Sequence, residues 1–401
     1  MCKRNIVIFR QQFVAPSQHT ARTAPKPIQT EMQETLRFFC SCLTIASLVA
    51  SPCSHAAEAV AVDVIHSVSD DSVLDDSVLD DSVLDDVTLP HSESVLPVDV
   101  EGACPSDESV AQDRIWLIST RGISRSVCCA DFEQPQFSVS RLSSNGCQTP
   151  SSMDEYLGGL LPERPVVVYV HGYRFTSCEA IRRGLRIHRE IACRRSAGPV
   201  DWVIWSWPSA KEKFISHDIR EKAKFTDTQG LYLAWLLKQH LRSGVPSTLI
   251  GYSFGGRVVT GSLHALAGGS LGGRSLPCEP IVNARIDVGL VAPAIEKDWL
   301  APNDYHALAT SNIDQLLLLY NQKDSVLKRY WLIDKVRGTM AIGFGRLQSF
   351  APRTDGSRIW LRARECSSWI GHTHDELDYY ERPCSAGCEM AQLVEDAWLI
   401  H

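Results

Sequence analysis

From residue 114 onward, short apolar segments alternate with longer amphipathic ones. The short segments predict strands at 115–120, 137–142, 166–170, 202–205, 248–252, 281–292 and 313–320. The amphipathic segments predict helices at 179–195, 228–241, 254–267 and 386–400. Because strands alternate with helices, residues 114–401 are predicted to form one α/β domain, a mostly parallel sheet with helices on both faces.

A different apolar run lies near the N-terminus. Residues 38–50 (FFCSCLTIASLVA) follow Arg37, and the small residues Ser54 and Ala56 come soon after. The run is too short for a membrane-spanning helix but suits the core of a signal peptide. We therefore predict that residues 1–56 are an N-terminal extension and signal peptide, cleaved after Ala56. The protein is then exported to the periplasm, the cell envelope or the medium.

Two points about this region stay open. The signal peptide starts late for a chain that begins at Met1, and a start at Met32 would give it a conventional length. The alternative is a cytoplasmic protein whose N-terminal apolar run is a buried helix. No later apolar run is long enough for a membrane-spanning helix, so no transmembrane span is predicted in the mature chain.

Residues 57–113 form an acidic, low-complexity stretch. Sixteen of the 47 acidic residues of the chain lie between Ala56 and Asp113, which includes no Lys or Arg. The motif DSVLD occurs three times in succession over residues 71–85. A five-residue period gives neither a helix nor a strand an apolar face, so we predict an exposed linker. A calcium-binding tract is the alternative, although the glycine turn of known calcium loops is absent.

The charge of the whole chain, −7, is therefore not the charge of the predicted domain. Residues 114–401 hold 34 basic and 29 acidic residues, a mildly basic balance. No interleaving of aromatic and basic residues accompanies it, so no nucleic-acid partner is predicted.

The motif with the clearest chemistry is GYSFGG at 251–256. It has the form G-x-S-x-G, follows a predicted strand and opens a predicted helix, the context in which such a motif presents a nucleophilic serine. Ser253 is the candidate nucleophile. The flanking glycines are needed because the turn is strained and tightly packed. The helix N-terminus also favours negative charge on a nearby oxygen.

A second motif, His171-Gly172-Tyr173, directly follows the predicted strand 166–170. A loop at this position can bring a backbone N–H opposite the nucleophile. We predict an oxyanion hole from the N–H of Phe254 and an N–H near Tyr173. His171 is expected to hold this loop rather than to act as a base.

Residues 115–400 resemble the α/β-hydrolase superfamily, because these motifs occur in the order that the superfamily has. The resemblance is closer to an esterase- or lipase-like bacterial family of uncharacterised role. The other matching segments are STR at 119–121, WSWPS at 205–209, Asn321-x-x-Asp324 and Gly371-x-x-His374. The resemblance implies a serine hydrolase that cleaves carboxylic esters or related acyl compounds through a Ser–Asp–His triad. It implies no cofactor and no metal.

The resemblance implies Asp324 as the acid, four residues beyond the end of a predicted strand. A solvated loop residue or a helix cap is the alternative reading of Asp324. Related sequences often place an acid after the strand 281–292, but this chain has Pro293-Ala294 there, with Glu296 and Asp298 as the nearest substitutes.

For the base, the resemblance favours His374, with His372 as the alternative. Trp207 and Tyr252 are expected at the substrate pocket. The expected partner is a small-molecule or lipid ester, and the sequence does not predict an oligomeric state. The competing hypothesis is a non-catalytic binding or scaffold protein of the cell envelope with the same fold, which has no need of Ser, Asp and His together.

The chain has 14 cysteines, ten of them after the predicted cleavage site. An even number in an exported protein permits disulfides, and the most attractive partners are Cys128, Cys129, Cys384 and Cys388. A zinc site is the weaker alternative, formed from Cys366, His372, His374, Cys384 and Cys388, because the cysteine spacing is not typical of zinc sites.

The signal peptide can be tested directly. N-terminal sequencing of the exported protein should start near Ala57 because cleavage is predicted after Ala56. A protein that still begins with Met1 would contradict the prediction.

Overall fold

The computed structural model describes residues 112–398, apart from 213–214, 334–338, 346–348, 382–383 and 385. The predicted signal peptide and all but the last two residues of the predicted acidic linker lie outside the described residues. No helix among the described residues has the length and apolar character needed to cross a membrane.

The strands of the main sheet are β1 (Arg114–Ser119), β2 (Ser138–Leu142), β3 (Gln148–Ser151), β4 (Val166–Val170), β5 (Asp201–Ser206), β6 (Ser247–Tyr252), β9 (Ile286–Val291), β10 (Ile313–Tyr320) and β11 (Trp360–Glu365). A small hairpin adds β7 (Ser270–Leu271) and β8 (Arg274–Ser275). The α-helices are α3 (Met153–Gly158), α4 (Ser177–Ala192), α5 (Ile215–Arg242), α6 (Phe254–Leu266), α7 (Ser367–Ile370), α8 (Leu377–Tyr380) and α9 (Gly387–Asp396). The 3-10 helices in the part of the chain that the structure describes are η2 (Val127–Cys129), η3 (Ala307–Ser311) and η4 (Leu327–Leu332).

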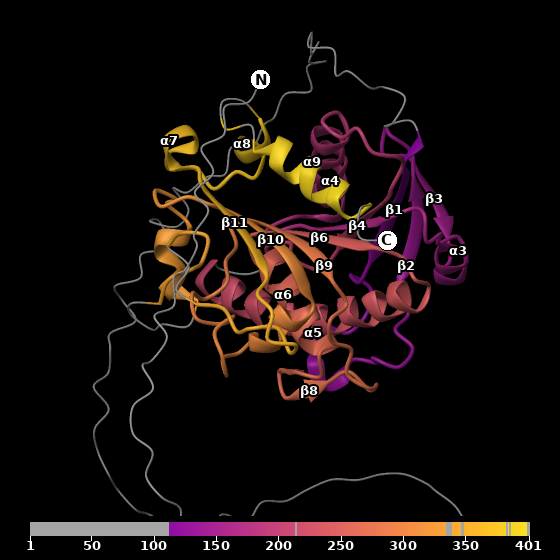
Figure 1. Ribbon diagram of the computed structural model, residues 1–401, viewed down its shortest axis with the longest axis horizontal. Coiled ribbons are helices and arrows are strands. Elements are labelled where there is room, and N and C mark those ends of the chain that lie inside the picture. The colour runs from indigo at the N-terminus through magenta and orange to yellow at the C-terminus, as the bar shows by residue number, and fades with distance from the viewer. Residues whose placement is uncertain are drawn as a thin grey trace, which may run out of the picture. The chain divides into compact units, whose positions relative to one another are not determined.

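The nine strands of the main sheet follow the order β11-β10-β9-β6-β4-β5-β1-β2-β3. Every neighbouring pair from β11 to β1 is parallel, whereas the pairs β1–β2 and β2–β3 are antiparallel, so that β2 alone runs against the other strands. Helices α4 and α9 cover one face of the sheet and α5 and α6 cover the other (Figure 1). The predicted α/β-hydrolase fold, a mostly parallel sheet with helices on both faces, is confirmed.

The centre of the sheet is the core of the domain. Every residue of β4, β5, β6 and β9 is buried, because helices cover both faces of these strands. This agrees with the β-branched run at 166–170 and with the short apolar runs predicted beside it.

In a parallel sheet the carboxyl ends of neighbouring strands meet at one edge. The loops after β4, β6 and β10 therefore start from the same edge.

The structure differs from the predicted elements mainly at the margins of the sheet. Strands β3 and β11 were not predicted. β11 (WLRARE) carries charged residues because it is an edge strand, and its arginines Arg362 and Arg364 pair with Asp396 and Glu389 of α9. Such a strand lacks the apolar signal that predicts strands.

Two further element boundaries differ from the prediction. Helix α5 starts at Ile215, well before the predicted residue 228. Strand β9 starts at Ile286 rather than at 281, after a loop in which Asn283 and Arg285 have positive φ.

Helix α6 approaches β4 closely because its first turn has glycines. A Cβ added to Gly255 would lie 2.1 Å from the carbonyl oxygen of Val170, and one added to Gly251 would lie 2.8 Å from the carbonyl oxygen of Gly255. Both contacts are with backbone atoms, which cannot move aside as a flexible side chain can. Glycine at these positions therefore sets how near the start of α6 lies to the end of β4.

We predict that Gly255→Ala destabilises the domain by about 3 kcal/mol or more, because the new methyl group would force α6 away from β4. Gly122→Ala is the matched control: a Cβ there meets nothing within 4 Å. Its effect should stay within about 0.5 kcal/mol. Urea denaturation of the two variants checks this, and equal midpoints for both would contradict the close-contact argument.

Candidate active site

The turn between β6 and α6 holds Ser253 in an unusual backbone conformation, with φ 51° and ψ −117°. Such strain persists only where surrounding contacts impose it. The Ser253 N–H donates to the carbonyl oxygen of Val291 at 3.0 Å. The Ser253 carbonyl accepts from the N–H groups of Ala294 and Gly256. Backbone contacts on both sides thus lock the serine into the turn.

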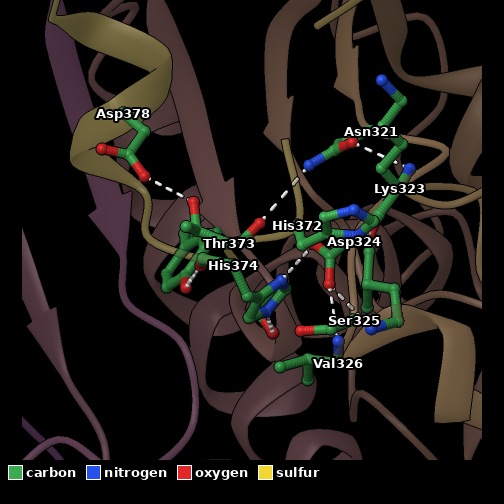
Figure 2. Close-up of polar contacts among 12 residues, drawn as sticks. Asn321, Lys323, Asp324, Ser325, Val326, His372, Thr373, His374 and Asp378 are labelled. Atoms are coloured by element: carbon green, nitrogen blue, oxygen red, sulfur yellow. Dashed lines mark hydrogen bonds and ion pairs between the residues drawn. The ribbon is translucent and has the colours of Figure 1, made fainter. Parts of the chain in front are cut away.

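Three residues from distant parts of the sequence meet at this turn. His374 Nε2 lies 3.0 Å from Ser253 Oγ, and His374 Nδ1 lies 2.6 Å from Asp324 Oδ2. Figure 2 shows the His374 ring directed at Asp324. All three side chains are buried. The structure therefore brings together the predicted nucleophile, base and acid.

Asp324 uses its two carboxylate oxygens differently. Oδ1 accepts from the backbone N–H groups of Val326 and Leu327, each at 2.9 Å, and so caps the turn that leads into η4. Oδ2 is left for His374. The backbone contacts of a cap and a contact with the predicted base, which the sequence left as alternatives, are thus made by one side chain. The backbone donors hold the carboxylate in a fixed orientation.

The other predicted candidates have different partners. Glu296 accepts from the indole N–H of Trp299, and Asp298 lies 3.9 Å from Lys297. His372 is exposed, and its Nδ1 contacts the carbonyl oxygen of Lys323 (Figure 2). Asp324 and His374 are accordingly the acid and the histidine that meet Ser253.

Asn321, whose spacing to Asp324 the sequence singled out without giving it a role, joins the two loops. Its side-chain amide donates to the carbonyl oxygens of Gly371 at 2.9 Å and Thr373 at 3.3 Å (Figure 2). The N–H of Ser325 donates to the carbonyl oxygen of His372. The loop with the acid therefore holds the loop with the histidine, through a side-chain amide and a backbone N–H that both donate to backbone carbonyls.

The His171-Gly172-Tyr173 loop packs directly on the nucleophile turn. A Cβ on Gly172 would lie 3.1 Å from Ser253 Cβ and 3.0 Å from the Tyr252 ring. The Tyr173 ring lies 5.9 Å from that of Phe254, and its hydroxyl donates to Asp218 of α5 at 2.5 Å. Phe254 is the first residue of α6, where backbone N–H groups have no acceptor within the helix. Both segments predicted for an oxyanion hole thus lie beside Ser253.

His171 supports the loop, as predicted from its position. The backbone N–H of Trp207 and the guanidinium of Arg121 both face its Nε2, and both groups can only donate. The ring proton of the neutral imidazole therefore belongs on Nδ1. This nitrogen faces the carbonyl oxygen of Gly172 at 2.9 Å. Burial and the nearby Arg121 lower the pKa of His171 to about 3. The imidazole is therefore neutral and structural.

Two predicted pocket residues have other roles. Trp207 is 0% exposed, stacks on His171 and donates its indole N–H to the His171 carbonyl, so it supports the loop and does not line a substrate pocket. Tyr252 is buried, and its hydroxyl donates to the carbonyl oxygen of His374. This contact anchors the histidine. The complete burial of Trp207 contradicts its predicted place in a pocket, because large aromatic residues with a polar group also serve as buried anchors. The substrate contact of Tyr252 stays a prediction.

Among the described residues, Cys128, Cys129, Cys384 and Cys388, the expected disulfide partners, form no disulfide. Cys128 and Cys129 are exposed neighbours in η2, Cys388 is exposed, and Cys384 is buried. In the part of the chain that the structure describes, no group of three or more His, Cys, Asp or Glu side chains is placed to hold a metal ion.

Comparison with solved structures finds esterases. Esterase B from Lactobacillus rhamnosis shares 15% identity over 67% of this chain and 85% of its own, with a TM-score of 0.33. An esterase from Pyrobaculum calidifontis shares 17% identity over 66% of this chain and 81% of its own, with a TM-score of 0.30. A thermostable esterase from Pseudomonas putida shares 12% identity over 66% of this chain and 80% of its own, with a TM-score of 0.31. No curated protein sequence matches the chain.

A family profile, described as alpha/beta hydrolase of unknown function (DUF900), matches residues 156–367. The match runs from α3 to the start of α7 and includes the nucleophile turn and Asp324. Since it spans more than half of the sequence and agrees with the observed sheet, the chain belongs to this alpha/beta hydrolase family.

Proposed function

We propose that the protein is a serine hydrolase that cleaves carboxylic esters or related acyl compounds through an acyl-enzyme intermediate. The observation that carries the proposal is the continuous contact from Ser253 Oγ through His374 to Asp324, with distances of 3.0 Å and 2.6 Å. A serine hydroxyl is a weak nucleophile unless an adjacent base accepts its proton. This arrangement supplies such a base and a carboxylate that orients it.

In the first step, Ser253 Oγ attacks the acyl carbonyl carbon while its proton passes to His374 Nε2. Asp324 accepts from Nδ1–H, which keeps the neutral imidazole in the tautomer that presents a lone pair to the serine. The same carboxylate stabilises the imidazolium that forms. The carbon–oxygen bond to the leaving alcohol then breaks, and the alkoxide takes the proton from Nε2.

The negative oxygen of the tetrahedral intermediate needs donors that are already in place. The proposed donors are the N–H of Phe254, at the start of α6, and a backbone N–H of the Gly172–Tyr173 segment. The helix N-terminus adds a favourable field at this point. Because the strained turn and the buried His171 fix both segments before substrate binds, little reorganisation accompanies the reaction.

The second step releases the acid. Water gives a proton to His374 Nε2 and attacks the acyl carbon, and the serine oxygen leaves with that proton. Nucleophile, proton carrier and oxyanion donors all come from the chain itself. The proposed substrate is a small-molecule or lipid ester, and the proposed place of action is outside the cytoplasm, on the signal-peptide pattern at 38–56.

The serine is tested by labelling with a fluorophosphonate probe, which bonds to activated serines. Wild-type protein should be labelled, and Ser253→Ala should abolish both labelling and hydrolysis of p-nitrophenyl esters, with a loss on the order of 10⁴-fold or more. Ser262→Ala is the matched control, a buried serine in α6, the helix that follows Ser253, whose hydroxyl donates to the carbonyl of Val259. Its labelling should equal that of wild type. Unlabelled wild type, or a labelled Ser253→Ala variant, would defeat the proposal.

The base is tested by comparing the two histidines of its loop. His374→Ala should lower kcat on the order of 10⁴-fold, because Ser253 then has no proton acceptor. His372→Ala should keep most of the activity, since that ring is exposed and its Nδ1 contacts the Lys323 carbonyl, not Ser253. Steady-state kinetics on a short-chain p-nitrophenyl ester measures both. The reverse order of effects would assign the base to His372.

A further inference from the structure

Glu376, two residues beyond His374, is a carboxyl group inside the protein. It is completely buried, as is Tyr169 in the central strand β4, and the Tyr169 hydroxyl donates to Glu376 Oε2 at 2.7 Å. The other oxygen, Oε1, has no hydrogen-bond partner among the described residues. Burying a carboxyl with a single partner is unfavourable, so packing alone does not account for a glutamate at this position.

In the loop that carries the base, each of the residues 374–376 makes its own contact with the rest of the fold. The carbonyl of His374 accepts from Tyr252 of β6, the side chain of Asp375 pairs with Arg183 of α4 at 2.5 Å, and Glu376 accepts from Tyr169 of β4. Three consecutive residues are thus held by three different elements of the fold. Of these contacts, the one at Glu376 lies deepest, against the centre of the sheet.

We propose that Glu376 is a positioning residue for His374: through Tyr169, its carboxyl group fixes the 374–376 backbone so that the imidazole stays within reach of both Ser253 and Asp324. The inference rests on the proposed function, because it concerns the base of that reaction. Glu376 is not placed at the reacting atoms and takes no part in proton transfer.

The charged and titratable groups around Glu376 determine its protonation state. They are Arg183 of α4, Tyr169 of β4, Tyr252 of β6, Tyr380 of α8 and the adjacent Asp375. The Arg183 guanidinium donates to Asp375. Burial alone would raise the pKa of Asp375, but this guanidinium holds the pKa below its usual value. Burial raises the pKa of Glu376 to about 8, against the opposing effects of Arg183 and Tyr169.

Glu376 is therefore the uncharged acid at neutral pH. Between 4.5, the ordinary pKa of a glutamate, and about 8, the folded chain holds a proton that the unfolded chain has lost. The contribution of this group to stability accordingly falls as the pH rises through that window and levels off above it. Above pH 8 the carboxylate adds a second negative charge beside Asp375. We expect the loop to loosen and the activity to fall there.

The experiment compares Glu376→Gln, Glu376→Ala and Tyr169→Phe in the full chain, with p-nitrophenyl ester kinetics from pH 6 to 10. Glu376→Ala should lower kcat about 10-fold and leave KM within about two-fold, because a displaced base affects the chemical step and not binding. Glu376→Gln keeps an oxygen that can accept from Tyr169 but cannot ionise. It should restore most of kcat and remove the fall near pH 8.

Tyr156→Phe is the matched control. The Tyr156 hydroxyl also makes a buried hydrogen bond of 2.7 Å, with His240, far from the base in the sequence and between other elements. This variant should lose stability as Tyr169→Phe does, but keep the kcat and pH profile of wild type. A pH profile changed equally by both tyrosine variants would show that any loss of stability has this effect, and would overturn the inference.

Two other outcomes also overturn it: wild-type kcat in Glu376→Ala, or a fall near pH 8 that persists in Glu376→Gln. If Glu376→Ala does not fold, the two volume-preserving variants, Glu376→Gln and Tyr169→Phe, carry the test. If wild type is neither labelled nor active, the proposed function has failed and amide hydrogen exchange decides the positioning role. Residues 371–377 should then exchange faster in Tyr169→Phe than in wild type, and equal rates would contradict the role.

Discussion

The close approach of α6 to β4 is the constraint on which the site depends. Gly255 lies against the carbonyl of Val170 with no room for a side chain, so the chain must leave β6 through a tight turn before the helix starts. That turn holds Ser253 at a positive φ and sets it beside the Gly172–Tyr173 segment. The strain at the serine is offset by the buried sheet beneath it, in which every residue of the central strands is covered.

Ser253 and His374, the proposed nucleophile and base, are held in place by different kinds of contact. Ser253 is locked mainly by backbone hydrogen bonds at the end of a central strand. His374 lies on a loop between two four-residue helices, and side chains hold it: Tyr252 on its carbonyl, Asn321 on the carbonyl of Thr373, and Asp324 on its ring. Such contacts are effective because they are buried, where unpaired polar groups are unfavourable and few alternative partners exist.

The sequence predicted those features of the fold and the site that arise from local backbone preferences and burial. It did not predict those that arise from contacts between distant segments. The run VVVYV and the pattern G-x-S-x-G predicted β4, β6, the turn and α6 because local backbone preferences and burial on both faces leave a clear pattern. β11 was not predicted, since its arginines pair with α9 across the fold and its composition is that of a surface segment. Trp207 was misassigned because an indole beside a site can face a ligand or the core, and composition does not distinguish the two.

The sequence by itself determined the α/β architecture, the position of Ser253 on its turn and the short list of acids and histidines for the site. These depend on periodicity, on glycines that a turn requires and on motif order, all of which are local. The tertiary structure alone decided that Asp324 and His374 meet Ser253, that Tyr252 and Trp207 are supports, and that Glu376 is buried against Tyr169. The physical reason is that partnership and burial depend on which distant segments fold against each other. A carboxyl group in the sequence His-Asp-Glu therefore carries no local sign of the environment that sets its charge.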